Sequence, residues 1–269
     1  MSTELSLFKS GLPDYLKGST DGITDALAAS SGGGRRKIST EGGVFRMLVN
    51  GQEVAVNEER SMNVIIVNAA PHVQREYYAS AYVKGQASTP VCYSNDGVKP
   101  DERSVSPQHA NCSNCPQNVK GSGQGESRAC RFRRLLAVMP ENEPNEFVYQ
   151  LGLSATSIFS SADSGKMGLQ AYAQHLASHR VPITGVVTEM RFDTASGVAS
   201  KLIFKPVRPV TKKEYELVQR LREAPETLAA ITLNITAQSS VLPEPVVVPQ
   251  KAETPPDNKL ADLLKEFDD

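Results

Sequence analysis

The stretch VFRMLVNGQEVAVNEERSMNVIIVNA, residues 44–69, decides the fold class of this 269-residue chain. It contains two strand-like runs, 44–49 and 52–56, separated by Asn50-Gly51, a dipeptide that favours tight hairpin turns. The next run, residues 62–69, is almost continuously apolar and predicts a buried strand. The chain therefore begins its folded part as a β-structure.

Further strand-like runs follow at 76–83, 135–139, 147–153, 186–192 and 201–207. Residues 166–178 have helical apolar spacing, and 211–222 predict a helix that starts with a capping box of Thr211 and Glu214. Because strands outnumber helices, we expect a β-rich α+β fold. Its sheet is either an oligonucleotide-binding-like β-barrel or a curved antiparallel sheet, with a few helices.

Composition divides the chain into four predicted parts. Residues 1–34 form a Gly- and Ser-rich flexible arm, 35–240 the β-rich core, 241–257 a Pro-rich linker and 258–269 an acidic tip. The net charge of −1 hides a polarity, because residues 252–269 carry −4 and the remainder carries +3. An export signal and an apolar membrane span are not apparent, so we expect a cytoplasmic protein with no membrane partner.

Four cysteines fall in or beside a polar insertion at about 90–133, where strand patterning stops. Cys92, Cys112, Cys115 and Cys130 match the donor set of a closed, structural zinc site, which would staple the insertion with one zinc ion per chain. His109 is an alternative ligand in place of Cys92. An iron–sulfur cluster, a redox dithiol and four unligated thiols remain open alternatives.

Basic and aromatic residues alternate in several places, as binding of unpaired nucleotides requires. The window 120–134 alone has a net charge of +4. The alternatives are core packing for the aromatic residues and solvation for the basic loop. The predicted nucleic-acid-binding residues are Arg35, Arg36, Lys37, Phe45, Arg46, Arg75, Tyr77, Tyr78, Tyr82, Lys84, Tyr93, Lys120, Arg128, Arg131, Phe132, Arg133 and Arg134.

The acidic tip has apolar residues at helical spacing between its acids, which suits docking on a partner protein. A tethered anionic segment can also occupy a cationic groove until nucleic acid displaces it. A solvated end is the alternative. The predicted partner-binding residues are Leu260, Leu263, Leu264, Phe267, Asp268 and Asp269.

This order of parts resembles bacteriophage single-stranded DNA-binding, helix-destabilising proteins such as that of the T-even phages. The runs RKIS (36–39), GGVFR (42–46), CYSNDG (92–97), CSNCP (112–116) and GSG (121–123) are similar to phage proteins of this kind over about residues 36–210. The zinc-ligand spacing of the T-even protein, which includes a histidine, is not matched here. The resemblance implies a non-enzymatic protein of the bacterial host cytoplasm that coats single strands in replication and recombination. It also implies a tail that recruits replication, recombination or transcription proteins of the phage or host.

Two other classes of function compete with this hypothesis. One is a transcription or replication adaptor that recruits a polymerase through its tail. The other is a nuclease with a zinc-stapled fold, for which Asp96, Asp101 and His109 are the candidate residues, although Asp96-Gly97 is equally typical of a turn.

Overall fold

The computed structural model describes residues 36–80, 88–141, 147–163, 165–198 and 200–234. The predicted arm, linker and acidic tip lie outside these residues, as do Arg35, Tyr82 and Lys84.

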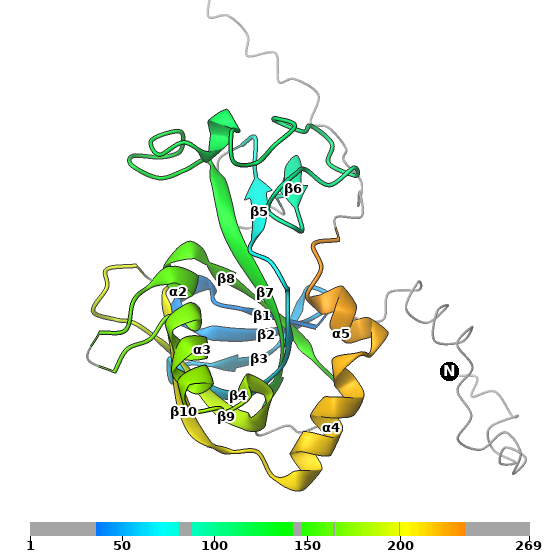
Figure 1. Ribbon diagram of the computed structural model, residues 1–269, viewed down its shortest axis with the longest axis vertical. Helices are drawn as coiled ribbons and strands as arrows, with labels where there is room; N and C mark the ends of the chain where they lie inside the picture. Colours follow the sequence, from blue (N-terminus) through cyan, green and yellow to red (C-terminus); the bar gives the residue numbers. More distant parts are fainter. Residues whose placement is uncertain (1–35, 81–87, 142–146, 164, 199, 235–269) are drawn as a thin grey trace, which may run out of the picture. The chain divides into compact units, whose positions relative to one another are not determined.

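The described strands form one sheet in which eight follow the order β10-β9-β4-β7-β8-β1-β2-β3 (Figure 1). The pairs along this path are antiparallel except for the parallel pair of β1 and β8. The bounds of these strands are β1 (Arg36–Ser39), β2 (Phe45–Val49), β3 (Gln52–Asn57), β4 (Ser61–Ala69), β7 (Cys130–Pro140), β8 (Tyr149–Ser154), β9 (Val186–Phe192) and β10 (Leu202–Pro209).

The sheet is curled and open. Four strands separate β2 from β9 in the sheet, yet the rings of Phe45 and Phe192 on these two strands have centroids 4.7 Å apart. Among the described strands, β3 and β10 end the order and are not paired with each other. The fold is therefore a β-rich half-barrel with few helices, as the strand content predicted.

Strand β4 explains why the run at 62–69 is apolar throughout. Val64 and Ile66 point into one core, which α2 (Ala155–Phe159) and α3 (Leu169–Ser178) help to cover. Ile65 and Val67 point into a second core on the other face, under α4 (Lys212–Arg222) and the segment that follows α5 (Pro225–Ala230). A strand buried on both faces has no polar side to alternate with.

Several sequence predictions are confirmed. Asn50 and Gly51 have φ of 54° and 80° and connect β2 to β3, as expected for a two-residue hairpin turn. The side chain of Thr211 accepts from the Glu214 backbone N–H, and Glu214 accepts from the Thr211 N–H, which completes the capping box of α4. β9 spans the expected residues, and four short strands and α-helices were not anticipated: β1, β6 (Cys92–Ser94), α2 and α5.

The Cys-rich insertion has more structure than its composition suggested. β5 (Gln74–Tyr77) lies between β6 (Cys92–Ser94) and the first residues of β7, and we call this three-stranded part the β5–β7 layer (Figure 1). Of the strand expected at 76–83, residues 81–83 lie outside the described residues, and the strand observed here, β5, runs from Gln74 to Tyr77. β7 begins at Cys130 rather than at residue 135. β7 is thus one strand that continues from the layer into the half-barrel.

The structure also has three short 3₁₀ helices among the described residues: one lies between β1 and β2, one directly follows Cys115, and one directly precedes β9. They are η3 (Glu41–Gly43), η4 (Pro116–Asn118) and η5 (Ile183–Gly185). The insertion is also bound to the end of the described chain, because the Asn95 side chain accepts from Leu233 N–H and donates to Leu233 O, at 2.8 and 3.1 Å.

Candidate nucleic-acid interface and cysteine cluster

The four cysteines gather at one end of the β5–β7 layer. Cys92 and Cys130 are both in register with Tyr77, one from each side of β5, so their side chains share one face. Cys112 and Cys115 come from the loop above. All four are reduced, and each is buried with 7–8% of its surface exposed.

The four thiols line a common cavity of about 10 Å³, which has room for about one water-sized body. His109, the alternative ligand, lines the same cavity, and its Nδ1 contacts the backbone of Asn111. Within the described ranges, no three His, Cys, Asp or Glu side chains are arranged as a metal site. Burial raises the pKa of Cys112, and raises that of Cys130 to about 11. The four thiols thus line one small cavity, but their sulfurs are not arranged as the ligands of a metal ion are.

The loop that carries Cys112 and Cys115 is tied to β5 through Asn118. The Asn118 side chain donates to the Cys112 carbonyl at 3.0 Å, and its backbone N–H donates to the Cys115 carbonyl at 2.9 Å. The guanidinium of Arg75 on β5 then donates to Asn118 Oδ1 at 2.6 Å. The position of Arg75 is therefore coupled to the cysteine loop.

Arg75 also stacks on an aromatic ring. Its guanidinium lies 4.0 Å from the centroid of Phe132, its cross-strand partner on β7, and the guanidinium of Arg128 lies 5.5 Å from the same centroid. Phe159 of α2, which is 47% exposed, contacts Phe132 edge-on at 5.6 Å. We call Arg75, Arg128, Phe132 and Phe159 the Phe132 cluster. Neither arginine has a carboxylate partner in the described part of the chain.

The opposite face of the layer repeats this pairing of arginine with an aromatic ring. The guanidinium of Arg131 lies 5.7 Å from the centroid of Tyr78, whose hydroxyl donates to Glu76 at 3.3 Å. Arg133 Nε lies 3.5 Å from the same Glu76 carboxylate. A Cβ on Gly152 would meet the Arg133 guanidinium at 2.8–2.9 Å, so the absence of a side chain lets Arg133 lie on β8.

The structure corrects two predicted binding residues. Phe45 is fully buried between β2 and β9, and Tyr93 is 1% exposed in the second core, where its hydroxyl donates to Asp101. Neither ring has a face left on which a base could stack. For Phe45, proximity to Arg46 in the sequence misled because strand neighbours point to opposite sides. Tyr93 has no basic neighbour and was predicted only from its place in the insertion.

The other described candidates are spread over several surfaces. Arg46 pairs with Glu53 and Lys120 with Glu126, at 2.7 and 2.8 Å. Arg36 on β1 stacks on Phe147 at 3.8 Å, and Arg134 donates to the Pro71 carbonyl. Lys37 is in register with Gln150, and Tyr77 lines the cysteine cavity.

Three residues that contact the predicted arginines were not identified from the sequence. Phe159 and Phe147 come from segments that carry no adjacent basic residue, and Asn118 is one of many polar loop residues. Only the tertiary contacts single them out.

The carboxylates proposed for a nuclease have structural roles. Asp96 Oδ1 accepts from the backbone N–H groups of Val98 and Lys99 and from the hydroxyl of Ser94, which makes the turn at Asp96-Gly97. Asp101 receives both Nε and Nη2 of Arg103, whose hydrogen bonds hold the pKa of Asp101 well below its usual range.

Comparison with protein-family models, curated proteins and solved structures finds no match to this chain. Over the described residues, no helix combines the length and apolarity needed to cross a membrane. The fold places the chain in the class of β-rich α+β proteins with a curled open sheet, to which the arginine-rich β5–β7 layer is joined through β7.

Proposed function

We propose that this chain is a non-enzymatic single-stranded DNA-binding protein whose contact surface is the β5–β7 layer. One observation carries the proposal: arginines stack on aromatic rings on both faces of this layer, and Arg75, Arg128 and Arg131 have no carboxylate partner among the described residues. Guanidinium groups that are not neutralised are available to phosphates, and exposed aromatic and guanidinium planes are what unpaired bases stack on.

The cysteines support this function indirectly. Four buried thiols that line one small cavity have the donor chemistry of a structural zinc site, and Cys92, Cys112, Cys115 and Cys130 would hold the ion once their sulfurs close around it. A bound zinc ion would supply no chemistry beyond stapling the loop. Through Asn118, that staple would fix the guanidinium of Arg75 beside Phe132. An iron–sulfur cluster uses the same donors and is the alternative occupant.

The acidic tip belongs to the same proposal as a recruiting segment for replication, recombination or transcription proteins. The adaptor hypothesis assigns the primary role to that segment and predicts that removal of residues 258–269 abolishes partner capture and leaves DNA binding intact. The nuclease hypothesis loses support, because Asp96 and Asp101 are engaged in turn and ion-pair contacts.

The test is fluorescence polarisation with labelled poly-dT, duplex DNA and RNA over a salt series. We expect poly-dT to be preferred to duplex and its affinity to fall steeply with salt. Phe132→Ala should weaken binding by about 1–3 kcal/mol, the value of one stacked base. In Arg131→Gln the affinity should fall less steeply with salt: the magnitude of the slope of log affinity against log salt should decrease by about 0.7, the value of one phosphate contact on a single strand.

Lys213→Gln on α4 is the matched control, because it removes one exposed positive charge outside the β5–β7 layer. It should leave both affinity and slope close to those of the unmodified protein. Equal binding of duplex and poly-dT, or an effect of Lys213→Gln as large as that of Arg131→Gln, would refute the proposed surface.

A further inference from the structure

A second cationic site lies outside the β5–β7 layer, beside the ends of β4 and β9. A pocket of about 180 Å³ lies there, and its charged lining residues are Arg60, which precedes β4, Arg191 near the end of β9, Asp193, which follows β9, and Lys166. This volume is smaller than that of pockets that hold drug-sized molecules, and it suits a small group.

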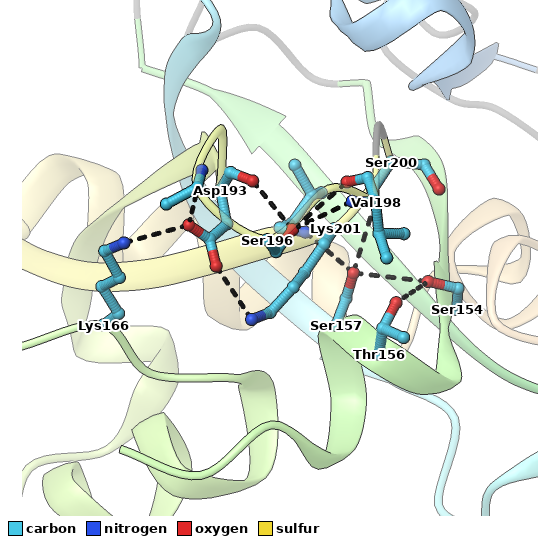
Figure 2. A network of polar contacts seen from close by, with 11 residues as sticks. Ser154, Thr156, Ser157, Lys166, Asp193, Ser196, Val198, Ser200 and Lys201 are labelled. Atoms are coloured by element: carbon cyan, nitrogen blue, oxygen red, sulfur yellow. Dashed lines mark hydrogen bonds and ion pairs between the residues drawn. The ribbon is translucent and has the colours of Figure 1, made fainter. Parts of the chain in front are cut away.

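Asp193 binds two lysine ammonium groups, so its negative charge does not make the pocket anionic. Its buried carboxylate binds Lys166 Nζ at 3.1 Å and Lys201 Nζ at 2.8 Å, as Figure 2 shows. The hydrogen bond from Lys201, with help from that of Lys166, lowers the pKa of Asp193 to about 2, so the carboxylate stays ionised and holds both ammonium groups. Lys166 is thereby fixed at the wall of the pocket.

Main-chain contacts fix the backbone of the two arginines that line the pocket. Arg60 has a φ of 57°, and its carbonyl accepts from the Phe192 N–H at 3.0 Å, which fixes the turn against β9. Ser61, the residue after Arg60, is in register with Arg191, and the side chains of Arg60 and Arg191 both line the pocket. Neither guanidinium has an ion-pair partner in the described part of the chain.

The charge of the pocket indicates its ligand. Three cations and one carboxylate line it, a net charge of +2, and Lys201 offsets Asp193 from behind. A phosphate monoester carries about −1.5 to −2 at neutral pH, whereas a phosphodiester carries −1. Arginine presents a planar fork that binds phosphate oxygens in pairs.

We propose that this pocket binds a doubly charged phosphate group, either inorganic phosphate or a phosphate monoester, through Arg60, Arg191 and Lys166. The site is separate from the β5–β7 layer and does not depend on the proposed function. Two sources share this chemistry: free inorganic phosphate or a small phosphorylated molecule, and the 5′-phosphate at the end of a strand.

Titration calorimetry of the full chain with inorganic phosphate tests the proposal directly. We expect saturable binding that weakens at least tenfold in Arg191→Gln and in Arg60→Gln and is unchanged in Lys213→Gln. Both arginines are exposed, so these variants should keep the near-ultraviolet circular dichroism of the unmodified protein. Absence of saturable binding, or binding by both arginine variants that is as tight as that of the unmodified protein, overturns the proposal.

Polarisation with dT oligonucleotides, with and without a 5′-phosphate, separates the two sources. A preference for the phosphorylated strand that Arg191→Gln abolishes supports the strand end as the source. Equal binding of the two strands beside arginine-dependent binding of inorganic phosphate supports the small-molecule source. Failure of poly-dT binding with phosphate binding retained would refute the proposed function alone, so the two proposals fail separately.

Discussion

Gly152 is the residue on which the position of Arg133 depends. A methyl group at Gly152 would displace the end of a flexible side chain and not the backbone, so Gly152→Ala should fold normally while Arg133 moves. We expect weaker poly-dT binding in Gly152→Ala and in Arg133→Gln. The double variant should bind poly-dT as tightly as the single variant that loses more affinity. A double-mutant cycle by fluorescence polarisation measures this coupling, expected at about 0.5–3 kcal/mol. Additive losses would mean that Gly152 acts elsewhere.

The pKa of Glu214 affects how the free energy of unfolding changes at acid pH. Two hydrogen bonds from Arg208 lower the pKa of Glu214 to about 2, against an ordinary value of 4.5. Between these values the unfolded chain binds a proton that the folded chain does not, so the free energy of unfolding falls as pH falls through this window. Urea unfolding at about pH 5 and about pH 3 should show a smaller loss in Glu214→Gln than in the unmodified protein.

The control for that experiment is Glu216→Gln on the same helix. Glu216 lies 3.9 Å from Lys212, both side chains are exposed, and such pairs contribute little. Its acid profile should match that of the unmodified protein, and an effect equal to that of Glu214→Gln would contradict the assignment.

At the scale of elements, β4 carries two cores at once. Ile65→Ala and Ile66→Ala remove side chains from opposite faces, and both are fully buried, so each should destabilise the protein by about 2–5 kcal/mol. Val54→Ala on the exposed strand β3 should change stability by about 0.5 kcal/mol or less. Chemical denaturation measures all three, and a tolerant Ile65→Ala would show that the second core is dispensable.

Element-level prediction from sequence succeeded where a local signal was strong. The Asn50-Gly51 turn, the Thr211–Glu214 capping box and the apolar run of β4 each specify their structure within a few residues. β6 was missed because it is three residues long and its strand partners come from elsewhere in the chain. The clustering of cysteines was predictable from spacing, whereas the Phe132 cluster depends on cross-strand register and on α2, which sequence does not reveal.

For the whole molecule, the β5–β7 layer with its four cysteines and the half-barrel should respond differently to loss of metal. Both hydrophobic cores lie in the half-barrel, apart from Tyr93 of β6. Metal analysis should find about one zinc per chain, and chelation or Cys115→Ser should abolish poly-dT binding while most of the far-ultraviolet strand signal remains. Ser113→Ala, an exposed neighbour in the same loop, is the control.

Two results would contradict this expectation. Protein isolated without metal that binds poly-dT fully would exclude a structural role for the ion. Visible absorbance with bound iron would assign the site to an iron–sulfur cluster instead.

The continuity of β7 determines where this chain tolerates changes in length. The loop at 121–127 closes on itself through bonds such as Gly121 N–H to Ser127 O, so we expect a residue gained or lost there to alter mainly the loop. One residue inserted between Cys130 and Leu135 would instead turn half of β7 over, exchanging the sides on which Phe132 and Arg133 stand and carrying Cys130 away from the other thiols. Homologous chains should therefore vary in length in the loop and keep a constant spacing along the strand.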